Sequence, residues 1–163
     1  MKRVGCLLLM FWLLFSGCSI TGDRIKEPVT FYYVHENYRK NMDEVIMSEV
    51  REAAGHRDDL EYLLALYSIG PSADDLKSLL PRGTIISVTE YMDDQIVLSL
   101  SDTVLTLTDA DFTLASACIA MTCMDLSDVQ QITVVCGERN ITIRQDNLLL
   151  YSSMVQNPQE VEK

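Results

Sequence analysis

Apolar residues in this chain recur with two different periods, and the order of those periods limits the fold more than any other feature. Alternation with a period of two is typical of strands, whereas spacings of three and four residues are typical of helices. Residues 31–34 and 45–51 carry the strand pattern. One apolar helix face follows, made of Leu60, Leu63, Leu64 and Tyr67. Gly70 and Pro71 are expected to end that helix.

The next segment predicts a second, shorter helix followed by a hairpin. Residues 72–75 offer a side-chain cap and acidic residues for a first helical turn, and residues 81–83 would end the helix. Residues 85–91 and 95–101 then predict two strands that turn at 93–94. One face of the 95–101 strand is apolar and belongs in the core. The other face is expected to be partly hydrated and carries Gln95, Val97, Ser99 and Ser101.

The last part of the chain predicts a helix and a final hairpin. Residues 108–111 read as a helix start, and the apolar positions that follow are Phe112, Ala115, Ile119, Thr122 and Leu126. Residues 132–136 and 141–144 are the two strands of the hairpin, joined through 137–140. Strands and helices therefore interleave, which predicts an α+β fold: a mixed β-sheet with two main helices packed on one face.

The first 17 residues have the layout of an export signal. Lys2 and Arg3 precede an apolar stretch from 4 to 15, which is too short to cross a hydrocarbon core of about 30 Å as a permanent helix. The run Phe15-Ser16-Gly17-Cys18-Ser19 resembles the lipobox of bacterial lipoproteins, with Phe15 in place of the usual Leu. That resemblance implies that the Cys18 sulfur is acylated with palmitate-type chains and becomes the new N-terminus. A plain secretory signal and an uncleaved N-terminal anchor are the alternatives.

These features predict the organisation of the chain and its location. Residues 1–17 would be the lipoprotein signal peptide, 18–30 the acylated cysteine and a tether, 31–151 the folded domain, and 152–163 an acidic tail. The expected location is the extracytoplasmic face of the cell membrane, held there by the lipid. Stable anchoring requires two or more acyl chains.

Charge limits the classes of partner. Removal of the signal takes away Lys2 and Arg3 but no acidic residue, so the net charge falls from −11 to −13. A surface this acidic repels phosphate backbones, and we expect no nucleic-acid partner. The field could attract cations or basic proteins, although a role in solubility is the simpler explanation.

Three cysteines remain in the predicted mature chain besides Cys18: Cys118, Cys123 and Cys136. Cys118 and Cys123 are five residues apart in a predicted helix, about 140° around its axis, so they are poorly placed to bind one ion together. We expect buried thiols that pack as small apolar groups. A disulfide from Cys136 to one of the two helix cysteines remains an alternative.

Candidates for catalysis are few. His35 and His56 are the only histidines, and neither lies in a metal-ligand spacing. Ser101 lacks the Gly-x-Ser-x-Gly turn that exposes a nucleophile. The acidic pairs 58–59, 74–75 and 93–94 are explained by two helix starts and a hairpin turn. We therefore expect no enzyme, no cofactor and no metal site, and we name no catalytic residue.

Several short motifs together resemble a known family. They are the helix end Leu64-Ala65-Leu66-Tyr67-Ser68-Ile69-Gly70-Pro71, the turn Leu79-Leu80-Pro81-Arg82-Gly83-Thr84 and the strand Val97-Leu98-Ser99-Leu100-Ser101. In this order they resemble the sporulation and spore germination domain called GerMN, over residues 31 to 143. Thr122 and Val134-Val135-Cys136-Gly137 also fit that domain, with Cys123 and Cys136 in place of the usual Leu and Asp. The resemblance implies a fold similar to the ring-building domains of sporulation secretion complexes.

The same resemblance implies an extracytoplasmic lipoprotein that acts through protein contacts. We expect a non-enzymatic interaction module in sporulation, germination or cell-envelope assembly, with envelope proteins or the cell wall as partners. Gln95, Ser99 and Ser101 are the candidate contact residues. The alternative is a lipoprotein that binds a cell-wall fragment or small molecule in a pocket lined by tyrosines such as Tyr32, Tyr33 and Tyr91. A hydrolase of the envelope is a third, weaker interpretation.

Overall fold

The structure, a computed structural model, describes residues 26–40 and 45–148. The predicted signal, the lipobox with Cys18 and the acidic tail lie outside the described residues. The elements in chain order are β1 (Pro28–His35), β2 (Ile46–Glu52), α2 (Leu60–Ser68), β3 (Leu76–Lys77), β4 (Ile86–Met92), β5 (Gln95–Leu100), the 3₁₀ helix η1 (Asp102–Thr106), α3 (Asp109–Leu126), β6 (Gln131–Cys136) and β7 (Arg139–Arg144).

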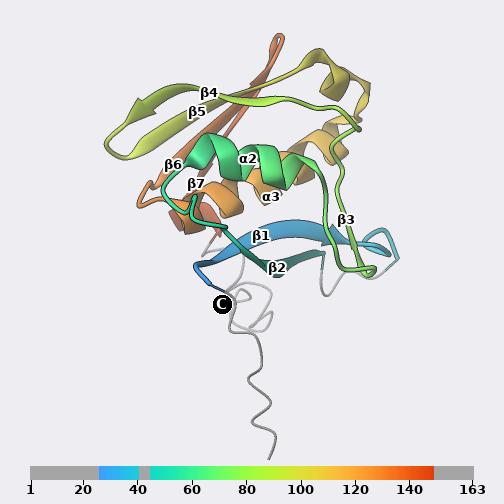
Figure 1. The fold of residues 1–163 in the computed structure, drawn as a ribbon. Helices are drawn as coiled ribbons and strands as arrows, with labels where there is room; N and C mark the ends of the chain where they lie inside the picture. The colour runs from blue at the N-terminus through green and yellow to red at the C-terminus, as the bar shows by residue number, and fades with distance from the viewer. Residues whose placement is uncertain (1–25, 41–44, 149–163) are drawn as a thin grey trace, which may run out of the picture.

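The strands form two sheets with the helices between them (Figure 1). The three-stranded sheet has the order β2-β1-β3 and is antiparallel throughout. The four-stranded sheet has the order β4-β5-β6-β7 and is mixed, because β5 and β6 run parallel. Helix α3 is the connection that makes this parallel pair possible. It packs against β1 on one side and β6 on the other.

The predicted α+β class, with helices on one face of a mixed sheet, is confirmed by the four-stranded sheet. The separate three-stranded sheet was not predicted. The strand pattern identifies which residues are extended, but pairing between strands far apart in the chain leaves no trace in local periodicity. Most predicted element bounds lie within a residue or two of those observed, although β1 begins at Pro28, three residues before Phe31.

The helix predicted from Ser72 is wrong. The segment contains only β3, which pairs with the end of β1 through Val34↔Lys77 and His35↔Leu76. The N–H groups of Ser72 and Ala73 donate to the Glu49 carboxylate at 2.9 and 3.0 Å. At the start of a helix these N–H groups would have no backbone partner, and here Glu49 of β2 accepts their hydrogen bonds instead. The pair Asp74-Asp75 accordingly lies in a connection and not in a helical first turn.

Aromatic side chains join α2 to the three-stranded sheet. The rings of Tyr33 and Tyr67 stack with centroids 4.7 Å apart and an interplanar angle of 2°, and Phe31 meets Tyr67 edge-on at 5.9 Å. The Tyr33 hydroxyl donates to the backbone carbonyl of Tyr67 at 3.0 Å. All three side chains are buried. A buried hydroxyl with a partner avoids the cost of desolvation without a hydrogen bond.

Two charged residues of β2 also face inward and hold the end of α2. Arg51 forms an ion pair with Glu49, and its guanidinium donates to the carbonyl of Gly70, just past the helix. Gly70 has φ +99°, a conformation that L side chains rarely adopt. The predicted helix end at Gly70 is therefore confirmed. A cation at this position also opposes the negative end of the helix dipole.

Helix α3 begins as predicted. Thr108 accepts a hydrogen bond from the Asp111 N–H, and Thr108 Oγ1 also donates to the Asp111 carboxylate. The carboxylate is held by Tyr38 and Arg39 from the segment after β1, and the hydrogen bond from Tyr38 is the largest cause that lowers the pKa of Asp111. The three described cysteines are buried and free, so the thiols expected from the sequence are present and the Cys136 disulfide is not.

Candidate functional site

The four-stranded sheet has one face on the helices and one face turned away from them. Inward positions carry the core, such as Ile96, Leu98, Ile132 and Val134, all with 0% exposure. The strand register aligns the outward positions in rows across the sheet. We call this surface the outer face; its rows are Met92-Gln95-Gln131-Arg144, Glu90-Val97-Thr133-Thr142, Ser87-Ser99-Val135-Asn140 and Ile85-Ser101.

Several polar side chains of the outer face already satisfy one another. Gln131 Nε2 donates to Gln95 Oε1 at 2.8 Å, and the hydroxyls of Thr133 and Thr142 lie 2.9 Å apart. Covering polar groups that keep their hydrogen bonds costs far less than covering unpaired ones. The surface can therefore be buried against another molecule at modest cost.

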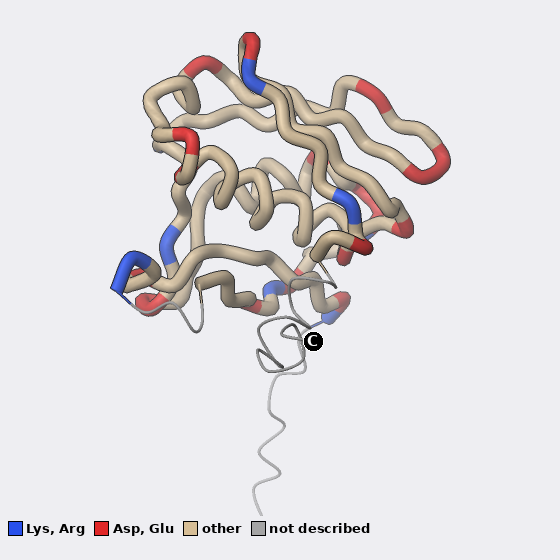
Figure 2. Tube along the Cα trace, turned by 180° about the vertical axis from the view of Figure 1, so that it is seen from behind, with Lys and Arg blue, Asp and Glu red and all other residues tan. Residues whose placement is uncertain are grey.

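Charge is nearly absent from the outer face, although the chain as a whole carries −11. Among its residues only Glu90 and Arg144 are charged, and they lie on the two edge strands. Figure 2 shows the strands of the four-stranded sheet largely free of charge, with acidic residues at their turns. Depletion of charge is a feature of the central part of protein interfaces.

The structure brings the predicted contact residues onto this surface. Gln95 and Ser99 lie on the outer face, and each is half-buried. Ser101 lies at its end, where Oγ accepts a hydrogen bond from the Ile85 N–H at 3.0 Å. That hydroxyl also contacts the Thr103 hydroxyl at 3.0 Å, so it holds the end of the sheet together.

Sequence reasoning missed the part of the surface that comes from β6 and β7. Thr133, Val135, Asn140 and Thr142 alternate with core residues, which predicts outward positions. Only the parallel pairing of β5 with β6 places them beside Ser99 and Gln95. The order of strands in a sheet cannot be read from their local pattern.

The tyrosines proposed for a binding pocket do not come together. Tyr33 is buried against Tyr67, and Tyr32, the next residue of β1, points to the opposite face of its strand. Tyr91 lies on β4 of the other sheet and is 61% exposed. The space lined by Tyr33, Tyr67 and Cys118 has no room for a water molecule.

The two histidines occupy local structural positions. His35 Nδ1 accepts a hydrogen bond from the Asn37 N–H at 3.0 Å. His56 stacks on Tyr62 with centroids 4.1 Å apart, and Asp59 caps α2 beside it. Within residues 26–40 and 45–148, no three His, Cys, Asp or Glu side chains form a group that could hold a metal ion. In that same part of the chain, no helix is long and apolar enough to span a membrane.

Comparison with known proteins finds similarity in the fold and none in the sequence families. No protein-family model matches the sequence, and no curated protein matches it. The tandem GerMN domains of the sporulation protein GerM from Bacillus subtilis are similar in structure, with 18% identity and a TM-score of 0.50 over 69% of this chain and 39% of that chain. The first GerMN domain of the same protein is 11% identical in sequence, with a TM-score of 0.47 over 69% of this chain and 86% of that one.

A further neighbour is a protein from Clostridium perfringens assigned as a lipoprotein, with 15% identity and a TM-score of 0.46 over 74% of this chain and 88% of that one. This chain spans less than half of the tandem protein, as expected for one domain set against two. At such identities the likeness concerns the fold. The chain contains a GerMN-like domain, as the sequence motifs predicted.

Proposed function

We propose that this GerMN-like chain is a lipid-anchored, extracytoplasmic docking module that binds an envelope protein through the outer face and carries out no catalysis. The observation that supports the proposal is the outer face itself: fourteen aligned side chains, charged only on the edge strands, on a strongly acidic chain. A partner can pack on a sheet face of this kind while the polar side chains of the face keep their hydrogen bonds to one another.

The proposed partner has an uncharged, flat surface of its own. Row by row, the outer face offers β-branched side chains such as Val97, Thr133 and Val135, with hydroxyls and amides between them. A second sheet can pack against such a face at about 10 Å. A partner that brings buried charges would leave them unpaired, because the centre of the outer face has no counter-ion to offer.

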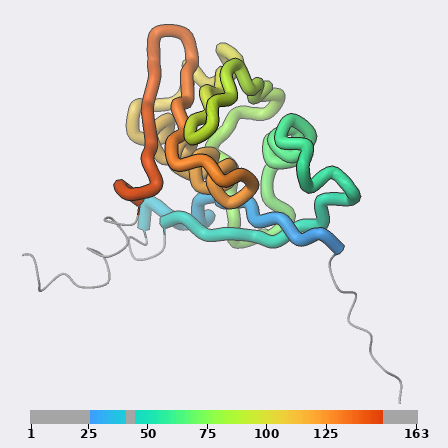
Figure 3. Tube along the Cα trace, turned by 90° about the vertical axis from the view of Figure 1, so that its left-hand side faces the viewer, coloured from blue at the N-terminus to red at the C-terminus, as the bar shows by residue number. Residues whose placement is uncertain are grey.

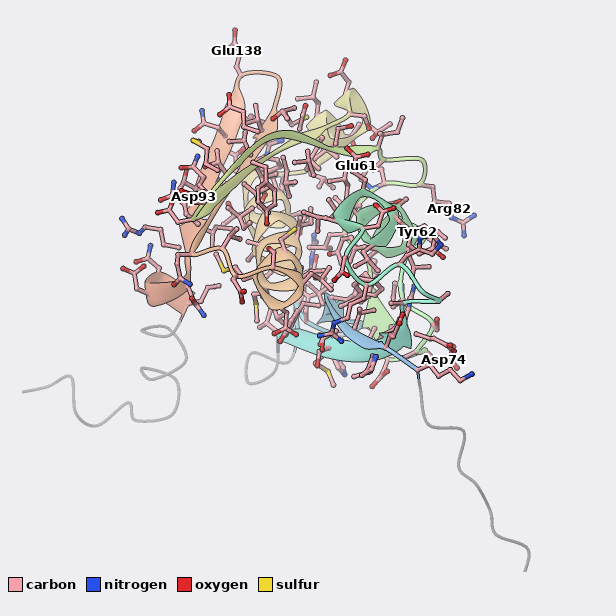
Figure 4. The ribbon with its side chains drawn as sticks, turned by 60° about the vertical axis from the view of Figure 1, so that its left-hand side comes forward. Glu61, Tyr62, Asp74, Arg82, Asp93 and Glu138 are labelled. Carbon is pink, nitrogen blue, oxygen red and sulfur yellow. The ribbon has the colours of Figure 1, made fainter. Side chains whose placement is uncertain are left out.

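The proposed lipid anchor sets the orientation of the domain relative to the membrane. Cys18 precedes Lys26, the first described residue, by eight positions, so an extended tether spans at most about 28 Å. The chain enters at the start of β1, whereas the β6–β7 turn at Glu138 is at the opposite end of the domain (Figure 4). The anchored domain would therefore turn the three-stranded sheet toward the membrane and the Glu138 end away from it.

The cellular setting we propose is sporulation, germination or envelope assembly. The tandem-domain neighbour is a sporulation protein, and the sequence motifs resemble the same domain. Two candidates for a catalytic centre, His35 and His56, have local structural roles that do not need a substrate. We expect the purified protein to show no turnover of muropeptides, esters or phosphoesters.

Metabolic labelling with a clickable fatty acid tests the anchor. Cys18→Ala should abolish the label and leave the precursor unprocessed, because its thiol is the proposed acceptor of the lipid. Cys6→Ala is the matched control, since it removes a cysteine from the proposed signal and should leave labelling intact. Label that persists in Cys18→Ala would contradict the anchor.

Pull-down from native membranes tests the docking role. Ser99→Glu should release the bound partner, whereas His35→Ala and His56→Ala should retain it. A stable histidine variant that loses cellular function while Ser99→Glu keeps it would contradict docking and favour an enzyme.

A further inference from the structure

Strand β4 is an open edge of the four-stranded sheet. It pairs with β5 on one side, and no strand of residues 26–40 and 45–148 pairs with it on the other. The edge strand of a sheet offers unpaired N–H and C=O groups to any extended chain that can reach them. Figure 1 shows the β4–β5 hairpin extending past both helices, and Figure 3 shows it from the side of its turn, between the β6–β7 hairpin and α2.

Exposed apolar side chains gather on this edge. Tyr91 is 61% exposed and Met92 47%, and Ile85 just before the strand is 66% exposed. Met92 lies on the outer face beside Gln95, whereas Tyr91 pairs with Ile96 and points to the other face. The hairpin end of β4 therefore presents apolar groups on both faces of an edge strand.

We propose that residues Glu90 to Met92 accept a short basic strand of a partner protein, which extends the four-stranded sheet by β-strand addition. The proposal rests on the docking function above and adds a second contact of the same partner, at the β4 edge beside the outer face, with its own chemistry. Main-chain hydrogen bonds would give affinity, and the alternating side chains would give specificity.

Charge selects a basic partner. The hairpin from residue 85 to residue 101 contains Glu90, Asp93 and Asp94 and no lysine or arginine. A strand with Lys or Arg opposite Glu90 gains a cross-strand pair of opposite charge, and the apolar residue next to it, on the other face, can pack on Tyr91. A second copy of β4 would place the same three acidic residues against these, which is unfavourable.

A bulge limits the length of the added strand. The register between β4 and β5 shifts between Val88 and Glu90, so the edge is interrupted there. Bulges twist an edge strand and prevent long uninterrupted pairing. Three residues, Glu90 to Met92, remain in regular register with β5 as far as the turn. A short segment fits them, whereas an extended sheet of many copies does not.

Fluorescence anisotropy of a labelled peptide, Lys-Val-Lys-Val-Lys-Val-Lys, tests the proposal with the full-length protein in a nonionic detergent. We expect saturable binding that Glu90→Lys weakens at least tenfold. Glu138→Lys makes the same change of net charge at an exposed turn of the same sheet and should alter Kd less than twofold. A peptide with an N-methyl group on every backbone nitrogen keeps the charge but has no N–H to donate from either edge of the strand, and it should not bind.

Other outcomes overturn the proposal. No saturable binding, equal loss in Glu90→Lys and Glu138→Lys, or full binding of the N-methyl peptide would each show that strand addition does not occur. A dimer in sedimentation that Glu90→Lys abolishes would assign the edge to a second copy instead. Circular dichroism confirms that each variant is folded. Loss of the partner in Ser99→Glu is independent of this peptide, so failure of strand addition and failure of docking are told apart.

Discussion

The backbone N–H of Tyr32 donates a hydrogen bond of 3.0 Å to Oγ1 of Thr122, and this contact joins β1 to α3. Strand β3 reaches only the last two residues of β1, so within residues 26–40 and 45–148 no strand pairs with the rest of that side of β1. Thr122 is fully buried, and its hydroxyl donates in turn to the Cys118 carbonyl at 2.9 Å. A helix side chain thus takes the place of a missing strand.

Thr122→Val tests the importance of this contact. Valine keeps the shape but removes the acceptor, so the Tyr32 N–H is left unpaired, and we expect a loss of about 1–3 kcal/mol in the free energy of unfolding. Urea denaturation followed by circular dichroism measures it. Thr122→Ser keeps the hydroxyl and should lose less; equal losses in the two variants would show that packing, not the hydrogen bond, decides the effect.

Arg51→Met should destabilise the fold strongly. The side chains of Arg51 and Glu49 are only 13% and 10% exposed, and the guanidinium also lies 5.4 Å from the Phe31 ring. Removing the cation leaves a buried carboxylate without its partner, which costs about 3 kcal/mol. In a urea titration, Arg57→Met at an exposed site should change stability by about 0.5 kcal/mol or less. A double variant that also carries Glu49→Gln should lose less than the two single variants together, and strict additivity would mean that the pair is not coupled.

Gly70→Val should cost about 1–3 kcal/mol through backbone strain. The nearest atom to an added Cβ is Ser78 Cβ at 3.9 Å, so space is available and the φ of +99° alone opposes the side chain. Thermal unfolding measures the change. Gly70→Asn should be milder, because asparagine tolerates positive φ better than valine. An unchanged melt for Gly70→Val would mean that the helix end is elsewhere.

Buried thiols make the protein sensitive to alkali. Burial raises the pKa of Cys118 and of Cys123 from 9.0 to about 12. A folded-state pKa above the unfolded value contributes stability that is present below pH 9 and is lost as pH rises toward 12. We expect the free energy of unfolding to fall across this range. Tyr67 has a raised pKa too and contributes to the same decline, so Cys123→Ala should flatten the pH dependence without removing it.

Thiol reactivity gives a second readout of the same burial. Iodoacetamide at pH 8 should leave both cysteines unmodified in the folded protein and label them in urea, since the thiolate is the reactive form. Rapid labelling of the folded protein would contradict the burial of these side chains.

Local patterns predicted most of the elements but not their assembly. The alternation of Ile96, Leu98 and Leu100 and the helical spacing up to Tyr67 report burial of single elements, and both are confirmed. The pairing Val34↔Lys77, by contrast, joins residues far apart in the chain. The helix expected at Ser72 is wrong because of another contact between distant parts of the chain. Glu49 on β2 accepts hydrogen bonds from the N–H groups of Ser72 and Ala73.

The candidate surface was predicted in part. The outward side of β5 follows from its alternation, so Gln95 and Ser99 could be named from the sequence alone. Thr133 and Thr142 could not be joined to them, since the parallel pairing of β5 with β6 depends on where α3 returns the chain. The depletion of charge also becomes visible only when all four strands are aligned.

Site-specific photo-crosslinking in native membranes tests the central claim most directly. A photoreactive amino acid at Ser99 or Thr133 should give one crosslinked protein partner, and the same probe at Val50, which is 51% exposed on the three-stranded sheet, should give none. The substitution Val97→Arg, next to Thr133 in the strand register, should abolish the crosslink from Thr133 while the domain stays folded. A partner captured from Val50 but not from Ser99 or Thr133 would contradict docking through the outer face.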